Sequence, residues 1–340
     1  MKRAVFWVHD PEAPSFRHRL AAHFPALEQA GIRCEVDVFP RRSYGRRILA
    51  RARGLAGVDL LVIAKLKLET GERAVVRNRA NRIVYDVDDA VYYAKPDRPG
   101  QPPGYSRRRV SKFLKTCAIS DLVTAGNPTI AAFARRSARH VEIVPTGIDS
   151  AAYMAPIPRA DGRFDVAWIG LPGNLPYLRL IERPLARLQA DFPGSLHVIS
   201  EALPAAFSAR TIFVPWSAAT EARALAECDA GVMPLEDDEW TRGKGGFKLL
   251  QYMAATLPTV ASPVGVNAEI VVPGQTGFLA RDEDGWEQAL RALAGDRQLR
   301  RRMGVAGRQR AERLFDRRVV GERLVSLYHA LISPPELAID

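Results

Sequence analysis

Short apolar runs rich in β-branched residues alternate with longer helical patterns along almost the whole chain. This alternation predicts parallel sheets covered by helices, because parallel neighbouring strands need a crossover connection that is usually a helix. The alternation stops between Pro145 and Asp161, where three prolines and a glycine occur without any periodicity, and it then starts again. A chain of 340 residues with this pause predicts two α/β domains joined by a linker.

The apolar patterns also predict individual elements. The expected strands are Ala4–Val8, Cys34–Phe39, Asp59–Ala64, Arg82–Asp86, Asp121–Ala125, Val141–Val144, Phe164–Ile169, Leu196–Ile199, Thr211–Val214, Ala230–Met233, Thr259–Ala261 and Gly277–Ala280. The expected helices include Phe16–Ala30, Leu175–Asp191, Thr220–Cys228, Phe247–Ala255, Gly285–Ala294, Gln298–Phe315 and Arg318–Ile332. Two such halves in tandem form a cleft between the carboxyl ends of their strands, where ligands bind by default.

The net charge of +11 favours binding to anionic partners. The segment from Arg41 to Arg53 mixes six arginines with Tyr44, Ile48 and Leu49. This composition suits a surface helix that touches anionic lipid or a lipid-linked molecule, and the alternative is a solvated helix face. Nucleic acid is not an expected partner, because aromatic residues do not interleave with the basic runs as a stacking surface requires.

The three cysteines are scattered, and no apolar run approaches the ~20 residues of a membrane-spanning helix. Neither a disulfide framework nor a zinc site is therefore expected, and the histidines show no ligand spacing. These features favour a protein of the reducing cytoplasm.

The segment after Cys228 has the features of a phosphate site. A strand pattern leads into an acidic and then glycine-rich basic loop, and a helix is expected to begin near Gly246. Loop glycines allow close approach to the backbone, and a helix N-terminus offers free N–H groups to an anion. Arg242, Lys244 and Lys248 add positive charge. The spacing matches neither a Walker loop nor a dinucleotide fingerprint. The alternative is a plain loop with solvated basic side chains.

These residues resemble glycosyltransferase family 4. The resemblance is specific in the second half, where it rests on the segments Lys248–Ser262, Pro263–Val271, Gly274–Ala280 and Leu299–Gly304, together with Gly307 and Arg308. It is weaker in the first half, where it rests on Arg17 and Arg19, on Tyr85–Asp89 and on Pro145–Asp149.

The resemblance implies the GT-B fold, in which two Rossmann-like domains face each other across a cleft. It implies an acceptor-side domain over residues 1–157, a nucleotide-sugar-binding domain over 158–316 and a C-terminal helix over 317–340 that packs back on the first domain. The implied reaction transfers a sugar with retention of anomeric configuration, without a metal or cofactor. Cations and helix dipoles would stabilise the leaving diphosphate. The implied acceptor is a glycan, a lipid-linked molecule or a small molecule, in cell-surface polysaccharide or glycoconjugate synthesis in the cytoplasm or at the inner membrane face.

The sequence departs from the family pattern at the donor site. The family has a Glu-x7-Glu motif whose first Glu touches the donor sugar and whose second holds the ribose, and the corresponding residues here are Gly243 and Gln251. Gln251 still offers hydrogen bonds to a ribose hydroxyl, whereas Gly243 has no side chain. A basic pair expected after the first strand of the second domain is replaced by Leu171 and Asn174. The donor-site residues that we expect are Gly170, Asn174, Trp216, Arg242, Lys244, Gly246, Lys248 and Gln251.

Two of these expectations need their alternatives stated. Trp216 follows a strand, and either stacks on the nucleobase or packs in the core. Arg242, Lys244 and Lys248 are expected to replace the missing basic pair in neutralising the diphosphate.

Asp86, Asp88 and Asp89 follow a strand and are expected to point into the cleft. Three interpretations are open: a metal-binding Asp-x-Asp, a phosphatase nucleophile, and acceptor binding or base assistance by Asp88 or Asp89. We prefer the third, and a purely structural role as loop caps is the alternative.

Two other functional classes fit a fold of this kind. One is a sugar-nucleotide epimerase, which needs no acceptor. The other is a non-catalytic partner or binding subunit, an alternative that the glycine at position 243 keeps open.

Overall fold

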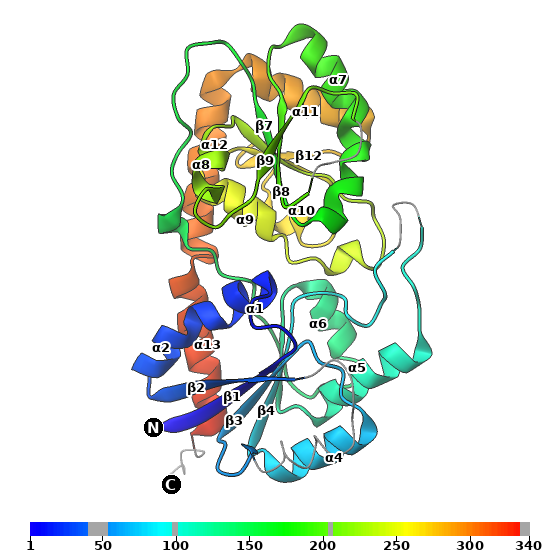
Figure 1. The fold of residues 1–340 in the computed structure, drawn as a ribbon, viewed down its shortest axis with the longest axis vertical. Helices are drawn as coiled ribbons and strands as arrows, with labels where there is room; N and C mark the ends of the chain where they lie inside the picture. Colours follow the sequence, from blue (N-terminus) through cyan, green and yellow to red (C-terminus); the bar gives the residue numbers. More distant parts are fainter. Residues whose placement is uncertain (40–53, 97–100, 203–206, 334–340) are drawn as a thin grey trace.

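The structure of the protein, a computed structural model, describes residues 1–39, 54–96, 101–202 and 207–333. In these residues the chain forms two parallel sheets of six strands each, in two domains stacked along the long axis of the molecule (Figure 1). The prediction of two Rossmann-like domains is therefore confirmed.

The sheet of the first domain has the strand order β2-β1-β3-β4-β5-β6. Its strands are β1 (Lys2–Val8), β2 (Ile32–Val38), β3 (Leu60–Ala64), β4 (Arg82–Val87), β5 (Leu122–Ala125) and β6 (Val141–Ile143). Its helices are α1 (Pro14–Arg19), η1 (Ala21–His23), α2 (Phe24–Gln29), α4 (Thr70–Arg79), α5 (Arg107–Ile119) and α6 (Pro128–Ala134). The central strands are buried on both faces, as a parallel sheet between helix layers requires.

The sheet of the second domain has the order β12-β11-β10-β7-β8-β9. Its strands are β7 (Val166–Ile169), β8 (Leu196–Ser200), β9 (Thr211–Pro215), β10 (Ala230–Met233), β11 (Thr259–Ala261) and β12 (Gly277–Leu279). The linker includes the short helix η2 (Ser150–Ala152). The helices of the second domain are η3 (Pro172–Ile181), α7 (Glu182–Asp191), α8 (Glu221–Ala226), η4 (Thr241–Gly243), α9 (Phe247–Ala254), α10 (Asn267–Ile270), α11 (Glu283–Gly295) and α12 (Arg297–Leu314). The strand order reverses between β7 and β10, and ligands bind at such a point in open α/β sheets.

The chain crosses between the domains at two adjacent places. The backbone N–H of Ile148 donates to Phe315 O at 2.8 Å, and the N–H of Arg317 donates to Ile148 O at 2.8 Å. Beyond this point α13 (Arg317–Ile332) returns to the first domain, where Leu324 and Tyr328 join the core around β1 (Figure 1). The predicted crossing of the final helix back onto the first domain is confirmed.

The predicted strands all form, with ends that differ by at most two residues. One predicted helix, Phe16–Ala30, is wrong in its continuity, because α1 ends at Arg19 and α2 starts afresh at Phe24. Pro25 explains the break: proline lacks the N–H that a continuous helix would use and is tolerated in the first turn of a new one. The predicted helix Leu175–Asp191 likewise divides into η3 and α7, with Pro176 inside the 3-10 segment.

The basic segment Arg41–Arg53 lies outside the described residues. None of the helices in the described part of the chain is long and apolar enough to cross a membrane.

Candidate active site

The two domains meet at the carboxyl ends of their strands. The ammonium group of Lys95, in the first domain, donates to the carbonyl of Gly173, which follows β7 in the second domain. Nearby, the amide of Asn127 donates to Lys244 O at 3.1 Å. These contacts place the loop before α9 against the first domain, next to the switch point between β7 and β10.

Lys248 occupies this switch point. It lies in the first turn of α9, and its Nζ is 3.8 Å from the centre of the Trp168 ring. A side chain at Gly170 would place its Cβ 2.3 Å from Nζ, so the glycine leaves the space that the lysine fills. Lys248 makes no hydrogen bond or ion pair with a described residue. Burial, reinforced by the charges of Lys244 and Lys95, lowers its pKa well below the usual value.

Lys244 and Lys95 complete a lysine cluster with Lys248. Lys244 Nζ donates to Asn174 Oδ1 at 3.4 Å, and burial is the largest cause of the lowered pKa of Lys244 and of Lys95. None of the three ammonium groups pairs with a carboxylate in the described part of the chain. Asp89 and Asp238 contribute opposing charges at Lys244 without forming an ion pair with it.

Like charges held together without a paired carboxylate are unfavourable, most of all at Lys244 and Lys248, which are partly buried, and a bound anion removes that cost. The N-terminus of α9 points to the same place, with Gly246 in the left-handed region at φ 68° immediately before the helix. The structure therefore brings together Gly170, Asn174, Lys244, Gly246 and Lys248.

Arg242 stands apart from this cluster. Its side chain pairs with Asp237 at 2.6 Å, and 47% of it is exposed beside the acidic residues that follow β10. The fixed local charge is thus already balanced at Arg242, in contrast to the three lysines. Its role in donor binding stays a prediction.

A second polar cluster surrounds Glu221 at the start of α8. Its carboxylate accepts hydrogen bonds from Trp216 Nε1 at 2.7 Å, from Gln251 Nε2 at 2.8 Å and from the hydroxyl of Tyr153. Lys248 and Gln251 are one helical turn apart, so α9 links the lysine cluster to the Glu221 cluster. His18 of the first domain lies close to this region. Its ring centre is 4.8 Å from that of Phe247, and the negative charge of Glu221 opposes the lowering of the His18 pKa by burial.

The geometry favours packing over a free stacking surface for Trp216. The ring packs against the core of the second domain, and its N–H is taken up by Glu221. Glu221 and Tyr153 were not identified from the sequence, because neither belongs to a recognisable motif. The one available signal was the position of Glu221 in the turn after β9, at the carboxyl edge of the sheet.

Gly243, where the family resemblance expects a glutamate, has no room for a side chain. A Cβ at this position would lie 2.4 Å from Ala90 Cβ and 2.9 Å from Ala90 N in the first domain. Two residues on, a Cβ at Gly245 would meet only Asp88 O, at an ordinary 3.9 Å. The missing glutamate is therefore explained by packing, since the loop from Asp88 to Ala90 fills the space.

Asp88 and Asp89 both lie at this contact and share one lysine. Lys65 Nζ is 2.9 Å from Asp88 Oδ1 and 3.1 Å from Asp89 Oδ2. Burial by itself would raise the pKa of Asp88, but Lys65 and Arg19 outweigh it and lower this pKa below the usual value. Asp88 is therefore a charged, paired group, and Asp89 is the more accessible of the two, with 37% of its side chain exposed.

The expectation that Asp86 points into the cleft is wrong. Its carboxylate is buried, accepting from Arg19 Nε at 2.8 Å and from the hydroxyl of Thr124 at 2.6 Å. Arg19 also donates to Val144 O at 2.7 Å, so the pair ties α1 to the ends of β4 and β6. Position along the chain explains the difference, since Asp86 lies inside β4, where Arg19 of α1 covers it, whereas Asp88 and Asp89 follow the end of the strand.

The described residues include no group of three His, Cys, Asp or Glu side chains arranged to hold a metal ion.

Comparison with known proteins agrees with this architecture. Residues 185–296 match the family described as glycosyl transferases group 1. No curated protein matches the chain. Sucrose-phosphate synthase from Thermosynechococcus elongatus is similar in structure with a TM-score of 0.75, at 17% identity over 97% of this chain and 99% of that one. HepE from Anabaena, in complex with UDP and glucose, gives a TM-score of 0.71 at 14% identity over 97% and 100%.

A third similar structure is the lipopolysaccharide outer core galactosyltransferase WaaB, with a TM-score of 0.68 at 12% identity over 97% of this chain and 99% of that one. The GT-B fold is thereby confirmed. The fold and the match in the second domain together define the protein as a glycosyltransferase of the GT-B type.

Proposed function

We propose that the protein is a retaining glycosyltransferase of the family 4 type, which transfers a sugar from a nucleoside diphosphate sugar to a glycan or lipid-linked acceptor. The observation that carries this proposal is the cluster of Lys95, Lys244 and Lys248, whose charges meet at the switch point without a paired carboxylate. A diphosphate has the charge and size to fill this role. The structures of HepE with UDP and with UDP-glucose support a donor of this kind.

The lysine cluster also suits the chemistry of the reaction. Negative charge grows on the diphosphate as the sugar leaves, and cations already in place stabilise that charge without reorganising. Lys244 and Lys248 come from the second domain, whereas Lys95 comes from the first. A complete diphosphate site therefore requires both domains to be in contact, which excludes water from the reacting centre.

The Glu221 cluster is the proposed site of the ribose. The family resemblance expects a carboxylate at position 251, and here Gln251 instead holds the carboxylate of Glu221 at 2.8 Å. The three protein donors leave about one of the four acceptor positions of the Glu221 carboxylate open, which is enough for one ribose hydroxyl. Gln251, which holds this carboxylate, lies about one helical turn from Lys248 along α9, and this spacing matches the order of ribose and diphosphate in a nucleotide.

The first domain is proposed to bind the acceptor. Asp89 is the accessible carboxylate there, with Asp88 beside it, and either would assist an acceptor hydroxyl within hydrogen-bond reach. Lys67 lies after β3, and burial, together with Arg109, Lys112 and Lys65, lowers its pKa to about 8. It makes no hydrogen bond with a described residue, a setting that favours an acceptor bearing negative charge. A lipid-linked phosphate meets this requirement and would place the enzyme at the inner membrane face, in cell-surface polysaccharide or glycoconjugate synthesis.

A thermal-shift screen against UDP-, GDP- and dTDP-sugars tests the proposal, because a cognate donor raises the melting temperature by mass action. We expect one nucleotide class to stabilise the protein and its sugar to be released slowly as hydrolysis product. No stabilisation by any donor would contradict the proposal. Binding without turnover, even with acceptor extracts, would favour a non-catalytic partner, and interconversion of the donor sugar would favour an epimerase.

Replacing Glu221 with alanine is expected to weaken nucleotide binding by about tenfold to a hundredfold, because hydrogen bonds to a charged group are lost. Titration calorimetry with the nucleoside diphosphate measures the change. Glu227→Ala, at the end of the same helix, is the matched control, since Arg223 on the surface is its one ion-pair partner among the described residues. Equal affinities of the two variants would show that Glu221 does not contact the ribose.

A further inference from the structure

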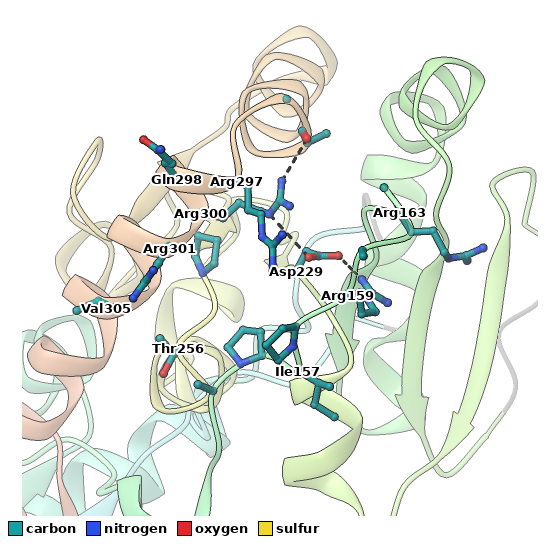
Figure 2. A pocket seen from close by; sticks show the side chains of 18 residues that line it. Ile157, Arg159, Arg163, Asp229, Thr256, Arg297, Gln298, Arg300, Arg301 and Val305 are labelled. Carbon is teal, nitrogen blue, oxygen red and sulfur yellow. Dashed lines mark hydrogen bonds and ion pairs between the residues drawn. The ribbon is translucent and has the colours of Figure 1, made fainter.

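A pocket of about 930 Å³ opens in the second domain at the amino ends of its strands, away from the cleft (Figure 2). Asp229, which precedes β10, and Pro258, which precedes β11, lie at its base. The lysine cluster lies at the opposite, carboxyl ends of β7 and β10. The pocket is therefore separate from the proposed donor and acceptor sites.

The two walls of the pocket belong to the two chain segments that connect the domains. One wall is the linker over residues 155–163, and the other is formed by the first turns of α12, which continues towards α13. The linker is held by a hydrogen bond from Ile157 N to Ala226 O at 2.7 Å, and Arg308 of α12 donates to Tyr153 O at 3.0 Å. A ligand in the pocket would therefore bridge both connections.

Arginines dominate the lining of this pocket. Its lining holds a single carboxylate, Asp229, and five arginines: Arg159, Arg163, Arg297, Arg300 and Arg301 (Figure 2). Asp229 forms ion pairs with Arg159 and with Arg300, and the distance from Arg300 Nε to Asp229 Oδ1 is 3.7 Å.

The remaining acidic groups nearby do not balance the arginines. Asp165, behind the wall, holds Arg159 at 2.5 Å and Arg163 at 3.3 Å. At the rim, Asp296 caps α12 and Asp161 accepts a hydrogen bond from the backbone of Arg163.

Two of the lining arginines are left without a partner. Arg297 and Arg301 make no hydrogen bond or ion pair with any residue in the described ranges. They are one turn apart on α12, so both residues lie on the same side of the helix, where both are exposed. The surplus positive charge affects Arg300: burial is the largest cause of its lowered pKa, and the charges of Arg297 and Arg159 lower the pKa further. The planar fork of a guanidinium group matches the oxygens of a phosphate, and two such groups on one side of a helix can approach the same anion.

We propose that this arginine pocket binds a phosphate-bearing organic molecule, either free in solution or as the headgroup of an anionic lipid. The guanidinium groups of Arg297 and Arg301 hold the phosphate. The apolar side chains of Ile157 and Val305, 40% and 42% exposed, cover the organic part. The volume lies within the range of small-molecule sites.

Titration calorimetry with inorganic pyrophosphate tests the pocket. The measurement uses a Lys244→Met/Lys248→Met background, which silences the lysine cluster and keeps the outcome independent of the proposed donor site. We expect residual binding in this background and a loss of affinity of at least about tenfold on adding Arg297→Ala/Arg301→Ala. The matched control is Arg302→Ala/Arg313→Ala, which removes two exposed charges from the same helix outside the pocket.

Equal affinities in the two arginine double variants would overturn the proposal, because binding would then reflect diffuse charge alone. Absence of binding to both pyrophosphate and lipid would overturn it as well. Sedimentation with phosphatidylglycerol vesicles identifies the source of the phosphate. A lipid source predicts that Arg297→Ala/Arg301→Ala reduces vesicle binding and that pyrophosphate competes for it. A soluble source predicts pyrophosphate binding in the pocket with vesicle binding unchanged by the same substitutions.

Discussion

Replacing Lys248 with methionine is expected to slow sugar transfer by about 10²–10³-fold and, at the same time, to stabilise the unliganded protein by about 1–3 kcal/mol. The rate falls because a fixed cation at the leaving diphosphate is lost. The stability rises because the partly buried ammonium group lies against Trp168 without a hydrogen-bond partner in the described chain, whereas methionine fills a similar volume at no such cost. Donor turnover and urea denaturation measure the two effects.

The same substitution has a predicted pH signature. Because the pKa of Lys248 in the folded protein lies below its unfolded value of 10.5, the unfolded chain binds more protons between these two pKa values. The free energy of unfolding of the wild type should therefore rise with pH across that interval. Below the interval Lys248 is protonated in both states, so its titration should give no pH dependence there. Lys248→Met should flatten this rise.

Lys115→Met is the matched control for Lys248→Met, since Lys115 is exposed on α5. It should change neither turnover nor the pH dependence. Retained transfer in Lys248→Met would reject the assignment of this lysine to the diphosphate, and a loss of stability would show that its charge is paired.

Replacing Gly243 with alanine is expected to destabilise the protein by about 1–3 kcal/mol and to weaken donor binding, because the added methyl group collides with Ala90 across the domain contact. Gly243→Glu, which restores the residue type of the family, should be more damaging still. Thermal unfolding and donor affinity measure the effect. The result would show that the absent glutamate is a consequence of how closely the domains approach.

Gly245→Ala is the control for this prediction, since its Cβ would have its nearest contact at 3.9 Å. A double variant adds a sharper test. Ala90→Gly removes the nearest atom and should recover part of the stability lost in Gly243→Ala, although Ala90 N remains 2.9 Å away. Equal stability of Gly243→Ala and Gly245→Ala would contradict the close packing of the domains at this point.

Lys244 and Lys248 could be singled out from the sequence because a single strand–loop–helix unit carries both. In such a unit, local spacing already determines that the side chains lie near the helix N-terminus. Lys95 and Glu221 could not be predicted as site residues, because neither belongs to this unit. Lys95 follows β4 and Glu221 begins α8, and nothing local in the sequence indicates that the first contacts Gly173 or that the second contacts Gln251.

The sequence by itself determined the class of fold, the strands and the position of a phosphate-facing helix after β10, because these depend on periodicity and on turn chemistry within short segments. Only the tertiary structure decided which charges remain unpaired. Arg242 and Lys248 look equivalent in the sequence, yet the first is neutralised at the surface by Asp237 and the second is partly buried and has no counter-ion in the described chain. The electrostatic role of a charged side chain depends on its burial and on partners distant in the chain, and both are set by how the two domains pack.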